Sequence, residues 1–299
     1  MTFRLHAALA LACLAAQCPA DDTRQLSTDP ATQTAAMTVA GQTCWAYCPS
    51  SPEGKPFFHP LAIPGTGEAF TSHRPADHTW HLGLWFSWKF INGVNFWEPD
   101  TNGVTRVLTQ DVTTGDDKRL TATATLAYLA KGREALREQR TVRVATAPSG
   151  NYTIEWDSTF TAQNTEAVLS ATPSKKDKDG LWATGGYAGL TLRLADSPAF
   201  TYAFANAEGL ADVRACGEPS PRFEITATSQ ASGARAKITF TDHPENPRHP
   251  TPWFARHSTT AHKGRGYYLV GPSMIFHEPL VLPPGTSARF RYTLAVERL

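Results

Sequence analysis

Hydrophobic and polar residues alternate over many short stretches of this chain. The alternation is clearest in residues 288–296, where Phe290, Tyr292 and Leu294 share one face and polar residues predominate on the other. A period of two is typical of an antiparallel strand with one buried face. Comparable runs rich in Val, Thr, Tyr and Phe predict strands over residues 105–112, 120–129, 138–144, 152–162, 189–194, 224–228, 236–240 and 267–270.

Helical patterns are weak by comparison. Residues 131–140 and 205–214 could each form a short helix, but 22 prolines interrupt most other windows. Many short strands separated by turn residues indicate an all-β protein with a large antiparallel β-sandwich or jelly roll. We found no repeat and no convincing linker, so we expect a single domain over residues 37–299.

The N-terminus has the pattern of an export signal. Residues 1–20 combine Arg4, a short apolar run and a small-residue end, which predicts a secretory signal peptide and a periplasmic or extracellular protein. Lipid anchoring is the less favoured alternative, because Cys13 and Cys18 follow small residues but lack a leucine three positions earlier. No later segment is long enough for an integral membrane helix. Residues 21–36 are polar and predict a flexible lead-in.

Charge and cysteine content exclude several classes of partner. The chain has 28 basic and 27 acidic residues, and loss of the leader removes Arg4 and no acid, so the charges then balance. This gives no reason to expect nucleic acid as a partner. Cys44, Cys48 and Cys216 allow at most one disulfide, and buried thiols are the default expectation. No phosphate loop, dinucleotide fingerprint or nucleophile elbow is present, so no cofactor is required. The oligomeric state is not indicated.

The densest candidate chemistry lies in residues 59–98, which read HPLAIPGTGEAFTSHRPADHTWHLGLWFSWKFINGVNFWE. Aromatic walls with a few converging polar groups are typical of a small-molecule site. Most of the rings should belong to the core, whereas Trp80 and Trp97 are better placed to stack on a flat ligand such as a sugar ring. Asn92 and Gly93 predict a tight hairpin turn in this stretch.

Five consecutive residues of this stretch, 77–81, contain three side chains that can bind a metal ion or move a proton, Asp77, His78 and His81. An upstream proline favours a turn, in which both imidazoles can converge. One interpretation is a divalent ion held by these histidines with His59 and a carboxylate such as Asp77 or Glu98. A second is an imidazole, tuned by a carboxylate, that moves protons on a substrate. A third is that the histidines only hydrogen-bond the loop backbone.

A second constellation spans residues 242–257, DHPENPRHPTPWFARH. Its prolines exclude regular structure and predict a loop. His243 would be a proton donor or ligand, and Arg256 would hold a carboxylate or a sugar hydroxyl; the alternative is a rigid rim without function. Histidines occur in two groups, at positions 59, 73, 78 and 81 and at positions 243, 249, 257, 262 and 277. If the two groups meet, they would line one pocket.

The motifs FFHPL, HRPADHTWHLGLWFSW and NGVNFW, followed by GYAGLTLRL, TDHPENPRHPTPWFARH and RYTLAV, resemble the bacterial PmoA-like proteins over about residues 40–297. The chain departs from that pattern at Trp80, where a histidine is usual, and at Leu82, where an arginine is usual. The resemblance implies an exported β-sandwich, a jelly roll or galactose-mutarotase-like supersandwich, among carbohydrate-use proteins. The inherited name suggests methane oxidation, but the spanning helices of a membrane oxygenase are missing from the sequence.

We therefore expect a protein that acts on a carbohydrate or glycoside by histidine and carboxylate acid–base chemistry. Alternatives are a non-catalytic glycan-binding module and a sugar enzyme that depends on a divalent metal. Hydrolysis, elimination and epimerisation stay open as reactions. The candidate catalytic residues are His78, His81, His243 and Asp77, and the candidate substrate-binding residues are His59, Trp80, Trp97, Glu98 and Arg256.

Overall fold

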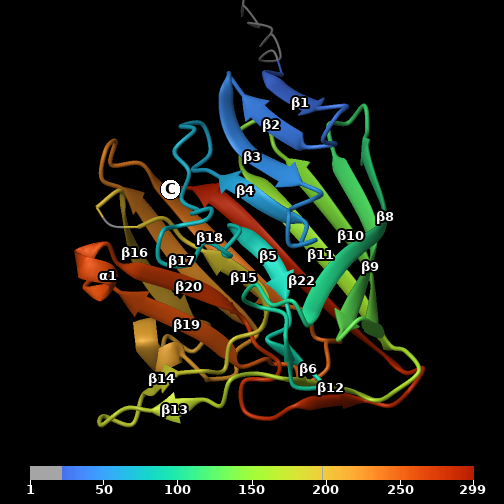
Figure 1. Ribbon diagram of the computed structural model, residues 1–299. Coiled ribbons are helices and arrows are strands. Elements are labelled where there is room, and N and C mark those ends of the chain that lie inside the picture. Colours follow the sequence, from blue (N-terminus) through green and yellow to red (C-terminus); the bar gives the residue numbers. More distant parts are fainter. Residues whose placement is uncertain (1–21, 197) are drawn as a thin grey trace, which may run out of the picture.

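Two large antiparallel sheets form the body of the computed structural model, which describes residues 22–196 and 198–299 (Figure 1). The first sheet has eight strands, in the spatial order β1 (Arg24–Thr28), β2 (Ala35–Val39), β3 (Gln42–Cys48), β4 (Phe57–Leu61), β5 (Leu84–Ser87), β15 (Gly189–Arg193), β20 (Tyr267–Pro272) and β19 (Trp253–Ser258). The second also has eight, in the order β16 (Phe200–Asn206), β17 (Arg222–Ser229), β18 (Arg235–Asp242), β22 (Ser287–Arg298), β11 (Tyr152–Ala162), β10 (Arg133–Thr146), β9 (Leu120–Ala130) and β8 (Gly103–Thr114).

Smaller elements accompany the two large sheets. A four-stranded sheet contains β21 (Leu280–Leu282), β12 (Ala167–Ser170), β6 (Phe90–Ile91) and β7 (Val94–Asn95). A short hairpin pairs β13 (Lys175–Lys176) with β14 (Trp182–Thr184). Elements β6, β12 and β13 lie together at one end of the molecule (Figure 1). Within residues 22–196 and 198–299, the helical segments are the 3-10 turn η1 (Asp212–Ala215) and the single turn α1 (Ala261–Gly264). The structure thus confirms the predicted all-β class and antiparallel sandwich.

The two sheets pack face to face through aromatic side chains. Phe86 of β5 packs on Phe160 of β11 with ring centroids 4.9 Å apart, and Tyr268 of β20 packs on Tyr202 of β16 at the same separation. Successive residues of a strand point to opposite faces. The neighbours of these inward rings therefore point to the outer face of the first sheet, where Trp85 lies.

The predicted strands are confirmed, and so is the predicted turn. Asn92 and Gly93 join β6 to β7, and both have positive φ, at 51° and 75°. That combination is the signature of a type I′ turn, which an Asn-Gly pair favours. Cys44, Cys48 and Cys216 are all free thiols.

The expected helix over residues 131–140 is wrong. Most of this segment belongs to β10, and Lys131 and Gly132 form its turn from β9, with φ of 50° and 78°. The run of charged residues resembles the polar face of an exposed helix, but two of these polar side chains point into the sandwich. Glu138 and Arg140 are buried there as an ion pair with an Oε1–Nε distance of 2.7 Å.

Residues 205–214 also lack the expected helix. They comprise the end of β16, a turn and the start of η1, so only the last part adopts a short 3-10 turn. The backbone N–H of Leu210 is held by the side chain of Asn206 at 2.8 Å. Such local side-chain caps compete with helical hydrogen bonds and favour turns.

The described part of the expected lead-in over residues 21–36 contains β1 and the start of β2, and these two strands pair with each other. Side-chain bonds also tie β1 to the second sheet: the Arg24 guanidinium donates to the Thr146 carbonyl at 2.5 Å, and Lys118 donates to the Arg24 carbonyl at 2.8 Å. The polar composition of these residues gave no sign of β1, because this edge strand is held by backbone pairing with β2. The predicted signal peptide, residues 1–20, lies outside the described residues.

None of the helices in the described part of the chain is long and apolar enough to cross a membrane.

Candidate functional site

A pocket of about 210 Å³ lies on the outer face of the first sheet. We call it the histidine pocket. Its walls come from the loop before β5, the segment after β7, the segment before β15, and strands β19 and β20. The lining residues are His78, His81, Trp97, Glu98, Thr184, Gly185, Tyr187, Phe254, Arg256, Tyr267 and Leu269.

The register of three strands explains why these side chains converge. Leu269 of β20 lies opposite Arg193 of β15 on one side and opposite Arg256 of β19 on the other. Directly paired residues of antiparallel strands point to the same face. Tyr267, two residues before Leu269, shares that face, while Tyr268 points into the sandwich. The sheet therefore provides a rigid floor carrying two arginines and a phenol.

A compact loop places the two histidines over this floor. The His78 N–H donates to the Pro75 carbonyl at 2.9 Å, and the His81 N–H donates to the His78 carbonyl at 3.0 Å. These consecutive turns stack the two imidazoles, with centroids 4.6 Å apart and an interplanar angle of 17°. The prediction that a turn would bring these imidazoles together is confirmed. Gly83 ends the loop at φ +84°, where a Cβ atom would lie 2.3 Å from the Phe58 carbonyl oxygen.

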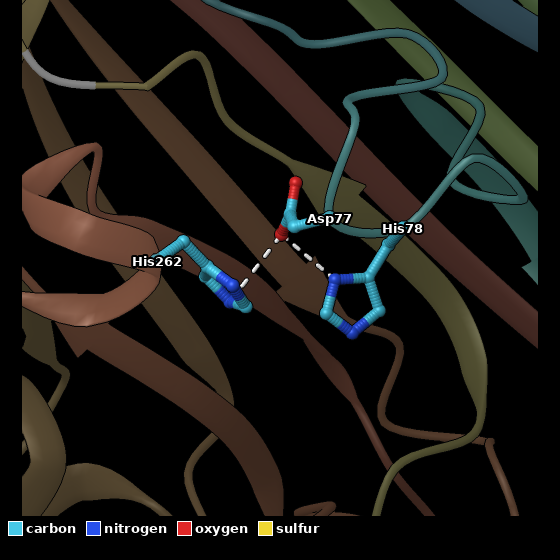
Figure 2. A group of neighbouring side chains, drawn as sticks. All are labelled: Asp77, His78 and His262. Atoms are coloured by element: carbon cyan, nitrogen blue, oxygen red, sulfur yellow. Dashed lines mark hydrogen bonds and ion pairs between the residues drawn. The ribbon is translucent and has the colours of Figure 1, made fainter.

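Asp77 and His78 form a hydrogen-bonded pair with an Oδ2–Nδ1 distance of 2.7 Å (Figure 2). The carboxylate is fixed from behind by Arg193, whose Nη2 lies 3.2 and 3.0 Å from its two oxygens. Arg193 is itself fully buried, bonds Asp196 at 3.1 Å and lies with Cζ 4.4 Å from the Tyr267 ring centroid. The pair is thus held by groups whose own positions are fixed by packing.

The surroundings of Asp77 decide which nitrogen of His78 carries the proton. Burial raises the pKa of Asp77, but the hydrogen bond from His78 and the charge of Arg193 outweigh it, so the pKa is lowered. An ionised carboxylate only accepts hydrogen bonds, so Nδ1 of a neutral His78 must be protonated and Nε2 must carry the lone pair. Figure 2 shows Nε2 on the side of the ring remote from Asp77. The geometry is that of a general base oriented by a carboxylate.

His81 is a neutral imidazole at the back of the histidine pocket. Burial, with the nearby His78 and Arg193, holds its pKa well below the usual range. Its Nδ1 is buried and has no hydrogen-bond partner among the described residues. The ring also packs on Trp85 and Trp97, at 5.0 and 6.2 Å between centroids. His81 is therefore an uncharged part of the pocket wall, with its unsatisfied nitrogen turned into the protein.

Glu98 supplies a carboxylate to the pocket. It forms a short ion pair with Lys89 and accepts a longer hydrogen bond, 3.4 Å, from the Tyr187 hydroxyl. Burial raises the pKa of Glu98, but the hydrogen bond and charge of Lys89 prevail and lower it. The side chain is therefore ionised and acts as a hydrogen-bond acceptor.

Arg256 is a cation with free donors. Its Nη1 makes one long hydrogen bond, 3.4 Å to the Trp182 carbonyl, and it forms no ion pair with a carboxylate of residues 22–196 or 198–299. A guanidinium that lines a pocket with most of its N–H groups unused is suited to clamp a carboxylate or a developing oxyanion.

Several predicted site residues lie elsewhere. His59 Nδ1 is 3.0 Å from the Thr71 hydroxyl and stacks on His73, and burial lowers its pKa to about 4. His243 does not line the pocket; its Nδ1 accepts the backbone N–H of Glu245 at 3.1 Å. The structure thus places His243 in the turn after β18, outside the lining of the pocket, and its role as a proton donor or ligand stays a prediction.

The two candidate stacking rings differ. Trp97 lines the histidine pocket but is only 2% exposed, which limits it to an edge of the wall. Trp80 is not among the lining residues and packs edge-on against the His78 ring, with centroids 5.2 Å apart.

One member of the second histidine group, His262, lies beside the Asp77–His78 pair, although it is not among the residues that line the histidine pocket. His262 belongs to α1 and lies with Nε2 3.5 Å from Asp77 Oδ2, and its ring centroid is 5.6 Å from that of His78 (Figure 2). From the later part of the chain, Arg256 lines the histidine pocket, whereas His262 contacts the Asp77–His78 pair without lining it. None of the described histidines of the second group is a lining residue, so the two groups do not line one pocket. Clustering in the second group was the available signal for His262; Arg193, Tyr187 and Tyr267 sit in strand or aromatic patterns typical of core.

The loop predicted over residues 242–257 is wrong at its ends, because Asp242 closes β18 and residues 253–257 belong to β19. Residues 243–252 form the loop between these strands. Asp242 accepts hydrogen bonds from Asn246 at 2.7 Å and from the Thr251 N–H at 2.9 Å, and it pairs with His249 at 2.8 Å. Burial raises the pKa of Asp242 in spite of these bonds. None of these four residues lines the histidine pocket, so this part of the loop acts as a scaffold for Arg256.

The fold and site define a two-sheet β-sandwich with a polar, aromatic pocket on the outer face of one sheet. The chain belongs to a family of unknown function, DUF6807, whose model matches residues 34–298. The match names no activity and no link to the PmoA-like proteins. No curated protein matches the chain.

Proposed function

We propose that this protein is an exported enzyme that moves a proton on a bound sugar, with His78 as the general base. The observation that carries the proposal is the Asp77–His78 pair, which is buttressed by buried Arg193 and borders a pocket. A carboxylate that orients an imidazole raises the population of the tautomer needed for proton abstraction. The other donors and acceptors of the pocket would hold the sugar.

The arrangement suits a sugar whose reacting carbon lies next to a carbonyl or carboxylate group. His78 Nε2 takes the proton from that carbon, and the electron pair moves to the neighbouring oxygen, which Arg256 stabilises. In epimerisation the electron pair returns to the carbon, which takes a proton from water on the opposite face, while His78 keeps the proton it removed and later releases it to solvent. In elimination a group on the next carbon leaves with the electron pair.

Hydrolysis by paired carboxylates fits less well. Glycosidases of the common type place two carboxyl groups on either side of the scissile bond. Among the described residues that line the histidine pocket, Glu98 is the sole carboxylate, and its pKa is lowered, so it is a poor acid. Asp77 lies behind His78, where it is bonded to Arg193.

A carbohydrate ligand is favoured by the size and lining of the pocket. Its volume is below the roughly 300–1,000 Å³ typical of drug-sized ligands, which suits a single ring. Trp97, Tyr187, Phe254 and Tyr267 supply aromatic surface for C–H faces, while Glu98 and the histidines supply polar groups. This combination is typical of sites for small polar rings.

The experiment is a screen of the full-length protein against a panel of sugars, with binding measured by calorimetry and products by mass spectrometry. The panel contains methyl glycosides and disaccharides of glucose, galactose, mannose, xylose and glucuronic acid, with the corresponding free acids and keto sugars. Turnover of a panel sugar by the wild type that disappears in His78→Ala would support the proposed enzyme with His78 as its base. Binding without turnover that persists in His78→Ala would replace it with a glycan-binding module.

A metal-dependent enzyme is the second candidate, favoured by one observation. Single ligand atoms of Asp77, His78 and His262 all lie within 4.8 Å of one another (Figure 2), and two imidazoles with one carboxylate are a common donor set for divalent transition metals. The Arg193 guanidinium on both Asp77 oxygens opposes a second cation there. Stoichiometric zinc, iron or manganese in the purified protein, lost in His262→Ala together with turnover, would establish this candidate.

A further inference from the structure

A second pocket, of about 340 Å³, adjoins the histidine pocket. It is formed by the loop before β4, the segment after β7 and the start of β8, and we call it the β8 pocket. Glu98 lines both pockets. Of the two residues that precede Glu98, Phe96 lines the β8 pocket and Trp97 lines the histidine pocket. The two cavities therefore meet at one residue.

A buried cation supports the boundary between the pockets. Lys55 is 5% exposed, and its ammonium donates to the Phe96 carbonyl at 2.6 Å and to the Trp97 carbonyl at 3.2 Å. An ammonium has three donors. The third has no partner among the described residues, and Lys55 lines the β8 pocket. A buried polar group with an unused donor at a cavity wall is suited to hydrogen-bond a ligand.

The loop that carries Lys55 is built tightly against β8. Gly54 has φ +69°, and a Cβ atom there would lie 2.0 Å from the Thr105 carbonyl oxygen. The adjacent Glu53 bonds Arg74 at 2.7 Å, and Arg74 belongs to the loop that presents His78. The wall of the β8 pocket and the histidine loop are thus fixed to each other.

The charges of the β8 pocket select the chemistry of its occupant. One cation, Lys55, faces three carboxylates, Glu53, Glu98 and Asp100, of which the first two are paired with Arg74 and Lys89. Such a lining repels an anionic group and offers many acceptors to hydroxyls. Phe96, Pro52, Pro99 and Val104 add apolar surface.

We propose that the β8 pocket binds an uncharged sugar unit joined to the unit held in the histidine pocket, so that the substrate is a disaccharide or a longer glycoside. The inference rests on the proposed function. The proposal also gives the orientation of the substrate. Any carboxylate of the substrate lies toward Arg256, and the neutral unit lies beyond Glu98, toward Lys55.

The test uses two exposed apolar residues of the edge strand β8. Val104 is 39% exposed and lines the β8 pocket, whereas Leu108 is 45% exposed on the same strand and does not line it. Val104→Trp would fill the pocket, and Leu108→Trp is the matched control with the same added ring. Calorimetry on the full-length protein would compare each methyl glycoside of the panel with disaccharides that contain the same ring.

We expect the matching disaccharide to bind wild-type protein about tenfold more tightly than the methyl glycoside. Val104→Trp should reduce that ratio to about twofold, and Leu108→Trp should leave it unchanged. A disaccharide whose second ring is glucuronic acid should lose the advantage. Equal binding of methyl glycosides and disaccharides, or an unchanged ratio in Val104→Trp, would overturn the β8 subsite while the proposed function stands. Absence of binding by every panel sugar would overturn both.

Discussion

Two aspartate–histidine pairs in this protein have nearly the same length and opposite settings. Asp77 and His78 are 2.7 Å apart beside a pocket, and Asp242 and His249 are 2.8 Å apart within a loop. The hydrogen bond of His78 and then the charge of Arg193 lower the pKa of Asp77 in spite of its burial. Asp242 has no such cation among the described residues; it accepts the Asn246 amide and the Thr251 backbone N–H, and burial raises its pKa. An Asp–His contact alone is therefore weak evidence of catalysis. The supporting cation and the adjacent pocket make the difference.

The largest effect that we expect is a loss of turnover when the Asp77–His78 pair is disrupted. His78→Ala should lower the turnover of the panel sugar by about 10²–10⁴-fold, the usual contribution of a general base. His249→Ala should leave turnover unchanged but lower the free energy of unfolding by about 1–3 kcal/mol, because it leaves a buried Asp242 oxygen with one partner fewer. Steady-state kinetics and urea denaturation measure the two effects. Equal losses of turnover in both variants would contradict the distinction.

A smaller effect is expected when the carboxylate of each pair becomes an amide. Asp77→Asn should lower turnover about 10²-fold with little change in sugar affinity, since it removes the charge that orients His78 and stabilises its protonated form. Asp242→Asn is the control and should act on stability alone. The comparison of kcat with KM is the readout, and a change confined to KM would contradict the positioning role of Asp77.

Arg256 provides a third comparison, between a free and a paired guanidinium. Arg256→Lys should weaken binding of the glucuronic acid glycoside about tenfold, because an ammonium lacks the planar fork that binds a carboxylate bidentately. Arg289→Lys is the matched control, since Arg289 pairs with Asp157 on the second sheet at 2.6 Å. Calorimetry measures both. Equal affinity of Arg256→Lys and wild type for this glycoside would contradict the proposal that Arg256 binds the sugar carboxylate.

The smallest effect concerns stability in mild acid. Burial lowers the pKa of His59 to about 4, below the unfolded value of 6.5, so the unfolded chain binds the proton first. Its stabilisation is complete above about pH 6.5 and is lost as the pH falls toward 4. His59→Gln should flatten the dependence of unfolding free energy on pH in this window, by at most about 1.4 kcal/mol per pH unit. Parallel curves for variant and wild type would contradict this.

The sequence predicted the sheets better than the site. Period-two alternation located strands such as β22, because burial of one face acts on each residue separately. The same rule failed at residues 131–140, where Glu138 and Arg140 are buried as a pair and mimic an exposed polar face. Pairing of distant residues cannot be deduced from a local pattern.

The site was half predicted for the same reason. The turn that joins His78 and His81 is local and was found, whereas Arg193 and His262 reach Asp77 from strands and loops far along the chain. His243 was proposed because it lies in the proline-rich segment 242–257, yet its Nδ1 accepts the backbone N–H of Glu245 within its own turn. Register across β15, β20 and β19 decides which side chains share the outer face.

Solvent deuterium incorporation tests the central claim most directly, because it reports proton transfer at carbon. The panel would be incubated with wild type, His78→Ala and His249→Ala in heavy water and analysed by mass spectrometry and NMR. We predict one sugar that gains deuterium, or appears as a deuterated or eliminated product, with wild type and His249→Ala but not with His78→Ala. The same conversion with His78→Ala, at the wild-type rate, would contradict the role of His78 as the base.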